Sequence, residues 1–110
     1  MGADIGNPPQ RARIKTGTYT GNGVDDRNID IGVDLAAKRN PYVIIKGSEA
    51  VYGVHRIEYG QGDAYMHFAN QADAADSIQA FTSTGFQVGQ LANVNSDTKN
   101  YRYIAIWQEG

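Results

Sequence analysis

The C-terminal third of the chain, Gly85 to Trp107, restricts the fold more than any other stretch. It begins with Gly85-Phe-Gln-Val-Gly89 and ends with Tyr101-Arg-Tyr-Ile-Ala-Ile-Trp107, with a segment rich in Asn, Ser, Asp and Thr between them. Aromatic and β-branched residues favour a pleated, half-buried surface, so both ends are predicted strands. Because Ile104 to Trp107 is apolar on both faces, this strand is expected to be central and covered on at least one side by a second layer.

Aromatic side chains form a row on this closing strand. Alternation places Tyr101, Tyr103 and Trp107 on one face, and Arg102 and Ile104 on the other. We interpret the row as part of the core or of a contact between subunits. A surface that stacks nucleic-acid bases would need Lys and Arg between the rings, and Arg102 lies on the opposite face. Stacking on a ligand, a sugar more than a nucleic acid, is the alternative.

The rest of the chain alternates short apolar or β-branched runs with turn residues. Six further strands are expected at Ile14–Thr20, Arg27–Gly32, Tyr42–Lys46, Val51–Glu58, Tyr65–Phe68 and Ile78–Thr82. One helical turn is expected within Val33–Arg39, and a loop with at most one helical turn at Ala69–Ser77. The 13 glycines are scattered, which suits many short strands with Gly-rich turns. The sequence therefore predicts a single all-β domain, an antiparallel, jelly-roll-like β-sandwich of about eight strands.

Residues 1–13 are predicted to form an extended N-terminal arm ahead of a domain that spans residues 14–110. Consecutive prolines favour polyproline geometry and block a helix. The residues that give the arm and its junction their character are Pro8, Pro9, Arg11, Arg13 and Lys15. The three cations make this end locally basic in a chain whose net charge is −2. A disordered terminus and an arm that docks on a neighbouring subunit both fit this composition.

Composition excludes several classes of function. The chain has no cysteine, which removes disulfides, thiolate zinc sites and cysteine nucleophiles and fits a protein made in the cytoplasm. A net charge of −2 provides no basic field for nucleic acid. No apolar run approaches the roughly 20 residues that span a bilayer, and the N-terminus has no apolar signal region. We therefore expect neither nucleic acid nor a membrane as a partner.

The alternation of Asp26, Asn28 and Asp30 superficially resembles a calcium loop. The EF-hand pattern requires Gly at its sixth position and a bidentate Glu at its twelfth, and this sequence has Ile31 and Ala37 there. A solvated strand face explains the alternation better.

The two histidines, His55 and His67, both lie in predicted strands. Their spacing is not that of a local zinc site, and His55 shares its predicted face with Val51 and Ile57. We expect a hydrogen-bonded histidine in the core or at an interface. No Ser or Asp lies in a recognised nucleophile turn, so we predict no enzymatic activity, no metal and no cofactor.

Several segments, taken in order, resemble a small β domain of tailed-bacteriophage virion proteins. Near the start they are Lys15-Thr-Gly-Thr-Tyr-Thr-Gly-Asn-Gly23, Arg27-Asn-Ile-Asp-Ile-Gly32 and Tyr42-Val-Ile-Ile-Lys46. Near the end they are Phe81-Thr-Ser-Thr-Gly-Phe-Gln-Val-Gly89 and, after a polar Asn-rich loop, the Tyr101 to Trp107 strand. The resemblance covers about Lys15 to Trp107.

The resemblance implies a non-enzymatic virion component. Such domains occur as capsid decoration (cement) proteins and within tail or fibre proteins that contact the host. A short chain without a repetitive shaft favours decoration, so the expected partner is the major capsid protein. The expected assembly is a homo-oligomer, most simply a trimer, made in the host cytoplasm and bound on the capsid surface with its arm clamping adjoining subunits.

Two alternatives remain. A tail-associated fibre or receptor-binding domain would contact a host-surface glycan through exposed loops, chiefly Gly60 to Tyr65 and Leu91 to Asn100. A carbohydrate-binding sandwich outside any virus is the other.

Overall fold

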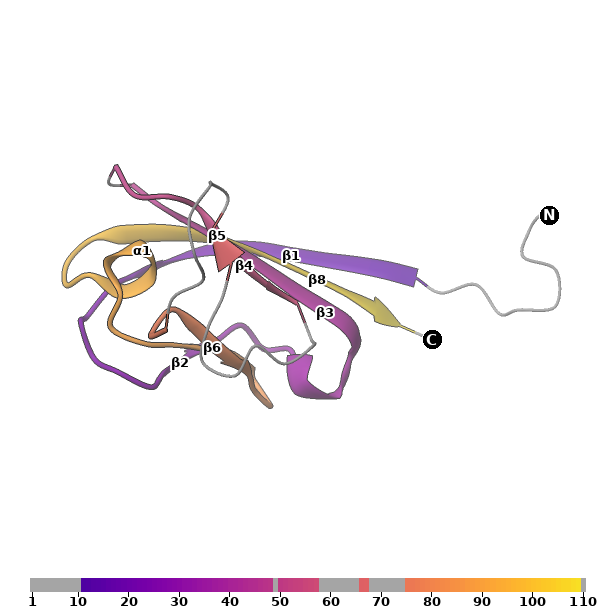
Figure 1. Ribbon diagram of the computed structural model, residues 1–110. Coiled ribbons are helices and arrows are strands. Elements are labelled where there is room, and N and C mark those ends of the chain that lie inside the picture. Colours follow the sequence, from indigo (N-terminus) through magenta and orange to yellow (C-terminus); the bar gives the residue numbers. More distant parts are fainter. Residues whose placement is uncertain (1–10, 49, 58–65, 68–74, 110) are drawn as a thin grey trace, which may run out of the picture.

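Two antiparallel sheets pack face to face in the computed structural model, which describes residues 11–48, 50–57, 66–67 and 75–109 (Figure 1). The five-stranded sheet has the order β1-β8-β3-β4-β5 and the three-stranded sheet the order β2-β7-β6. The strands are β1 (Arg11–Thr20), β2 (Arg27–Asp30), β3 (Arg39–Gly47), β4 (Val54–Ile57), β5 (Met66–His67), β6 (Ile78–Phe81), β7 (Gly85–Val88) and β8 (Asn100–Glu109). The predicted all-β sandwich is confirmed. The described residues form seven strands of four or more residues, one fewer than predicted, and the two-residue β5.

Strand β8 lies between β1 and β3, which confirms the predicted central position. Tyr101, Tyr103 and Trp107 are buried on its inner face, where the Tyr103 ring packs edge-on against Phe86 of β7. Burial of the strand on both faces was also expected and is wrong, because Ile104 and Ile106 on the other face are only half-buried. The reason is that β2, β7 and β6 cover one face of the larger sheet.

Strand β3 shows the same asymmetry. Val43 and Ile45 are fully buried, whereas Tyr42 and Ile44 on the opposite face are half-buried. Burial on both faces, expected from four consecutive apolar residues, is therefore also wrong here. A four-residue apolar run indicates a strand that crosses the core. It does not indicate whether one face of that strand or both faces are covered.

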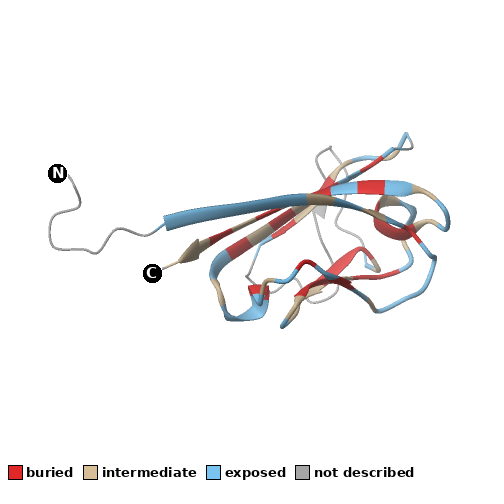
Figure 2. Ribbon diagram, turned by 180° about the vertical axis from the view of Figure 1, so that it is seen from behind, coloured by how far each residue is buried: buried red, intermediate tan, exposed pale blue. Residues whose placement is uncertain are grey.

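Strand β1 begins at Arg11, three residues before the predicted start at Ile14. Its pairing with β8 continues to Arg11 opposite Glu109, so the backbone ladder extends the strand through a run of polar side chains. Both strands extend past the three-stranded sheet, and the start of β1 is exposed (Figures 1 and 2). β1 is also the edge of the five-stranded sheet.

Two short helical segments connect the strands. The turn η1 (Leu35–Ala37) confirms the predicted helical turn, and the Asp34 carboxylate caps it by accepting from the Ala37 backbone N–H at 3.1 Å. The turn α1 (Ala92–Asn95) lies within the segment predicted as a polar loop, and it buries Asn95 completely. Most of the uncertain Ala69–Ser77 segment lies outside the described residues.

The core fills the space between the sheets. Phe86 on β7 is fully buried and packs edge-on against Tyr19 and Tyr103, with ring centroids 6.3 and 5.6 Å away. Ile29 and Ile31 point inward, as the alternation of Arg27–Gly32 predicts. Aromatic rings from both sheets therefore meet at one point of the core.

Tyr19, near the end of β1, makes the stability of the fold sensitive to alkaline pH. The Tyr19 hydroxyl donates to the Val94 carbonyl at 2.6 Å, and its ring stacks on Tyr101 with centroids 5.3 Å apart. Burial raises the pKa of Tyr19 far above its ordinary value, and Tyr101 adds to the rise while Arg27 opposes it. The unfolded chain therefore loses this proton above about pH 10 while the folded chain keeps it.

We expect the free energy of unfolding to fall by up to about 1.4 kcal/mol for each pH unit above 10 through this group. Urea unfolding between pH 8 and pH 11 measures the slope. Tyr19→Phe should make the slope shallower, whatever its effect at neutral pH. Tyr52→Phe, at an exposed tyrosine, is the matched control. Equal slopes for Tyr19→Phe and the wild type would contradict this assignment.

Candidate docking face on the five-stranded sheet

The five-stranded sheet has an outer face, which points away from β2, β7 and β6. Directly opposite residues of an antiparallel pair lie on the same face, so the strand register defines three rows of side chains across β1, β8, β3 and β4. The first row is Ile14, Ile106, Tyr42 and Ile57; the second is Thr16, Ile104, Ile44 and His55; the third is Thr18, Arg102 and Lys46. Together these three rows make up the outer face.

The first row leaves apolar surface in water at both of its ends. Ile14 is 65% exposed and Ile57 is 37% exposed, which makes them two of the four exposed large apolar side chains in the described part of the chain. Ile104 and Ile106 are half-buried, since each packs among its cross-strand neighbours. A continuous apolar strip on a surface indicates a contact with another molecule.

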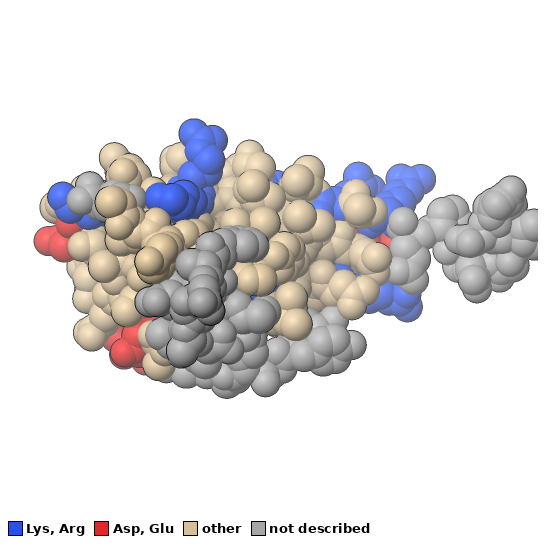
Figure 3. All heavy atoms as spheres, turned by 45° about the horizontal axis from the view of Figure 1, so that its top comes forward, with Lys and Arg blue, Asp and Glu red and all other residues tan. Residues whose placement is uncertain are grey.

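Charge on the outer face has one sign. Lys46 and Arg102 stand in the third row, and none of the described residues in the rows is an Asp or Glu. Figure 3 shows Lys and Arg side chains gathered toward the two ends of the molecule, with a largely uncharged stretch between them. The face is therefore largely apolar over two rows, with Thr16 and His55 at the ends of the second, and basic at one end.

His55 is held by a neighbour on the same face. Its Nδ1 lies 2.7 Å from the Tyr42 hydroxyl oxygen, and the two rings meet edge-on at 5.5 Å. Burial raises the pKa of Tyr42, which keeps the phenol protonated and able to donate. The predicted hydrogen bond of His55 is confirmed. Its predicted core position is wrong, because Val54 and Arg56 form the buried face of β4 and His55 is half-buried on the outer face. The His67 side chain lies outside the described residues, and the described part of the chain contains no cluster of three His, Asp or Glu suited to a metal ion.

The residues predicted to dock the arm are only partly described. Pro8 and Pro9 lie outside the described residues. Arg11, Arg13 and Lys15 are exposed on β1 and occupy the strand face opposite Ile14 and its row. They form a basic stripe at the end of the sheet that the three-stranded sheet does not cover (Figure 1).

An ion pair between Lys38 and Glu109 lies at the same end of the sheet. The Glu109 Oε1 lies 2.8 Å from the Lys38 Nζ and accepts from the Trp107 indole N–H at 3.1 Å. The hydrogen bond from Lys38 lowers the pKa of Glu109, with a smaller effect of the same sign from Arg13.

The predicted aromatic row belongs to the core. Tyr101, Tyr103 and Trp107 are 2%, 7% and 8% exposed. The Tyr101 hydroxyl donates to the Ala92 carbonyl at 2.6 Å and accepts from the Ser96 backbone N–H at 2.7 Å, so it holds both ends of α1. The row is too buried to stack on a ligand.

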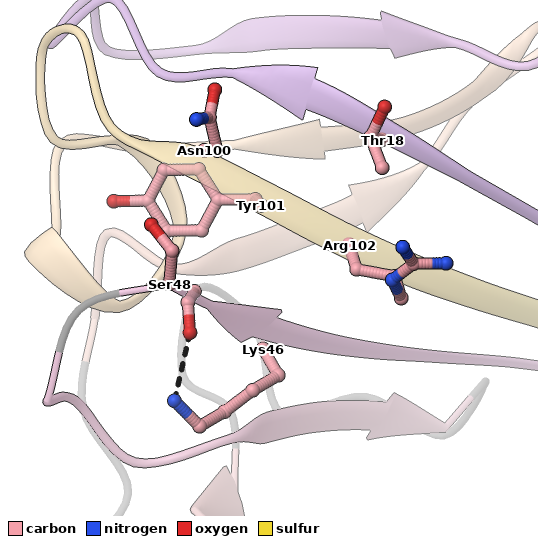
Figure 4. A pocket seen from close by; sticks show the side chains of 7 residues that line it. Thr18, Lys46, Ser48, Asn100, Tyr101 and Arg102 are labelled. Atoms are coloured by element: carbon pink, nitrogen blue, oxygen red, sulfur yellow. Dashed lines mark hydrogen bonds between the residues drawn. The ribbon is translucent and has the colours of Figure 1, made fainter.

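Sequence reasoning missed a shallow pocket of about 320 Å³ at the basic end of the outer face (Figure 4). Its walls are Thr18, Lys46, Gly47, Ser48, Asn100, Tyr101 and Arg102. These residues come from three strands that are distant in sequence and, for Ser48, from the turn after β3, and only the register of β3 and β1 on β8 brings them together. The available signal was the placement of Lys46 and Arg102 in predicted strands.

Comparison of the chain with models of protein families, with curated proteins and with solved structures finds no match in any of the three. Within the described residues, no helix is both long and apolar enough to cross a membrane. Functional inference for this chain therefore depends on the chemistry of the outer face.

Proposed function

We propose that the protein is a non-enzymatic component of a tailed-phage virion that decorates the head shell, and that it binds the major capsid protein through the outer face. The observation that carries the proposal is the outer face itself, with two largely apolar rows, a basic third row and exposed Ile14 and Ile57. The resemblance of the segments between Lys15 and Trp107 to virion β domains supports the choice of partner.

The size of the face sets what else the interface needs. Four strands spaced about 4.8 Å apart and three rows spaced about 6.8 Å apart give a flat area of roughly 400 Å². A stable interface takes about 800 Å² from each partner. The basic stripe of Arg11, Arg13 and Lys15 lies on the opposite face of β1, so it would add area only if the partner wraps around this edge strand, and the residues before it would supply the remainder. A trimer would bind through three copies at once, which raises overall avidity without new contacts.

Antibody-labelled electron microscopy of intact particles tests the virion role. Label distributed over the head supports decoration. Label confined to the tail tip supports the tail-associated receptor-binding alternative instead, and particles without label contradict both. Analytical ultracentrifugation of the purified protein tests the trimer.

Ile14→Asp is expected to weaken binding to purified heads by about 10- to 100-fold, because burial of one isoleucine side chain contributes about 1.5–3 kcal/mol. Val24→Asp is the matched control, since Val24 is 56% exposed and lies outside the outer face. Co-sedimentation with heads measures both variants. If Val24→Asp weakens binding as much as Ile14→Asp, the outer face is not the docking surface.

A deletion of residues 1–10 separates the arm from the sheet, because β1 starts at Arg11. We expect the shortened protein to fold with an unchanged circular dichroism spectrum and to bind heads at least 10-fold more weakly. Binding equal to that of the full chain would remove the clamping role of the arm and leave the outer face as the docking surface.

A tail-associated receptor-binding domain is the second candidate function. The observation that favours it is the pocket of about 320 Å³ on the outer face, which falls in the size range of small-ligand sites. Of the loops expected to contact a glycan, Gly60 to Tyr65 lies outside the described residues. The other, Leu91 to Asn100, is fixed by a buried hydrogen bond from Asn95 to the Gly89 carbonyl and by two partly buried hydrogen bonds of the Tyr101 hydroxyl.

A further inference from the structure

We infer that the pocket between β1, β3 and β8 receives a carboxylate, supplied by an Asp or Glu side chain of the docked protein. The inference rests on the proposed docking through the outer face and names the group that the basic end of that face recognises.

The first reason is the exposed guanidinium of Arg102, which shares one row with a second cation. Lys46 on β3 stands directly opposite Arg102 on β8, and like charges in this position destabilise an antiparallel pair. The Lys46 ammonium donates to the Gly47 carbonyl at 2.8 Å, while the Arg102 guanidinium is exposed and forms no hydrogen bond or ion pair with the described residues (Figure 4). A bound anion would give the Arg102 guanidinium the partner that the described residues do not provide.

The second reason is the chemistry of the pocket walls. Side chains of Thr18, Ser48 and Asn100 line the pocket beside the two cations, and each carries a hydrogen-bond donor. The Thr20 hydroxyl donates to the Asn100 Oδ1 at 3.3 Å, so part of the acceptor capacity of this amide is already used. An ionised carboxylate only accepts hydrogen bonds, and its two oxygens match the planar fork of an arginine.

The third reason concerns the source of the carboxylate. The pocket adjoins the second row, since Ile104 is the next outward side chain after Arg102 on β8 and Ile44 the next before Lys46 on β3. An extended protein segment covers both features, with its acidic side chain in the pocket and apolar neighbours on the isoleucines. An acidic sugar of pocket size would leave the isoleucines in water.

Titration of the ¹⁵N-labelled protein with two peptides, followed by NMR, tests the inference without any virus particle. The probes are acetyl-Val-Glu-Val-amide and its isostere acetyl-Val-Gln-Val-amide. We expect the Glu peptide to shift the amide signals of Lys46, Ser48 and Arg102 and to bind at least 10-fold more tightly than the Gln peptide. Added NaCl should reduce this ratio, because the site is open to solvent.

Arg102→Gln should abolish the preference for Glu, and Arg39→Gln, at an exposed arginine of β3 outside the pocket, should preserve it. Both positions are exposed, and the unperturbed spectrum of each variant verifies its fold. Equal affinity for the two peptides overturns the inference, as does glucuronate binding at the pocket more tightly than the Glu peptide, which would point to an acidic sugar. If the protein prefers the Glu peptide but the antibody labels no particles, the carboxylate site stands and the virion role is rejected. If the antibody labels heads but the protein binds both peptides equally, the virion role stands and the carboxylate site is rejected.

Discussion

Replacing Asn95 with alanine is expected to lower the free energy of unfolding by about 3 to 5 kcal/mol, a large part of the stability of a domain this size. The side chain is fully buried, and its Nδ2 donates to the carbonyls of Val24 and Gly89 at 2.8 and 3.0 Å. Its Oδ1 accepts from the Asn22 backbone N–H at 3.0 Å and from the Arg27 guanidinium at 3.1 Å. Alanine would leave these groups without their partner and create a cavity, and each buried polar group that loses its partner costs about 1–3 kcal/mol.

Two further variants show whether the hydrogen bonds or the volume of Asn95 matter. Asn93→Ala is the matched control, because Asn93 lies in the same turn and makes one exposed hydrogen bond, to the Tyr52 carbonyl at 3.0 Å; we expect a loss below about 1 kcal/mol. Asn95→Asp keeps the shape but points a carboxylate oxygen at two carbonyls. Its deficit should shrink as the pH falls, because a protonated carboxyl can donate one of the lost bonds. Wild-type stability for Asn95→Asp at neutral pH in urea unfolding would contradict the importance of the two donated bonds.

The strands were predictable where their signal is local. Alternating or continuous runs of β-branched and aromatic residues mark β2, β3 and β8. Such a run can be recognised from residues that are close together in the sequence. The start of β1 was not predictable from local sequence, because Arg11 and Arg13 belong to no apolar pattern. These residues adopt a strand conformation because they pair with β8. Burial on one face or two also depends on the second sheet, whose extent no short run of residues specifies.

The candidate docking face could not be predicted from short stretches of sequence either, because it depends on how distant strands pair. Arg102 and Lys46 were both placed in predicted strands, but their opposition follows from the register of β3 on β8, two strands far apart in sequence. Asn95 lies in a stretch of polar residues that suggests an exposed loop, and it is buried because the end of β1 and the turn after it pack over α1. Polar residues with tertiary roles carry no periodic signal.

Among the residues between the two sheets, Phe86 is expected to contribute most to stability. Phe86→Ala is expected to lower the free energy of unfolding by about 3 to 5 kcal/mol, through lost transfer energy and the cavity left behind. The ring is fully buried on β7 and touches Tyr19 and Tyr103 of the opposite sheet edge-on, so its loss removes aromatic contacts contributed by β1 and β8 together.

Phe81 provides the comparison, because it stands directly opposite Phe86 in the ladder of β6 and β7 and is only partly buried. We expect Phe81→Ala to cost about half as much or less in urea unfolding, and Phe86→Leu to recover a part of the loss by filling the cavity. Equal losses for Phe81→Ala and Phe86→Ala would mean that the edge of the three-stranded sheet, rather than the aromatic contact between the layers, determines how firmly the second sheet is held. In that case the backbone hydrogen bonds of the five-stranded sheet, rather than the aromatic core beneath it, would hold β1, β8, β3 and β4 in register. The outer face would then depend mainly on those hydrogen bonds.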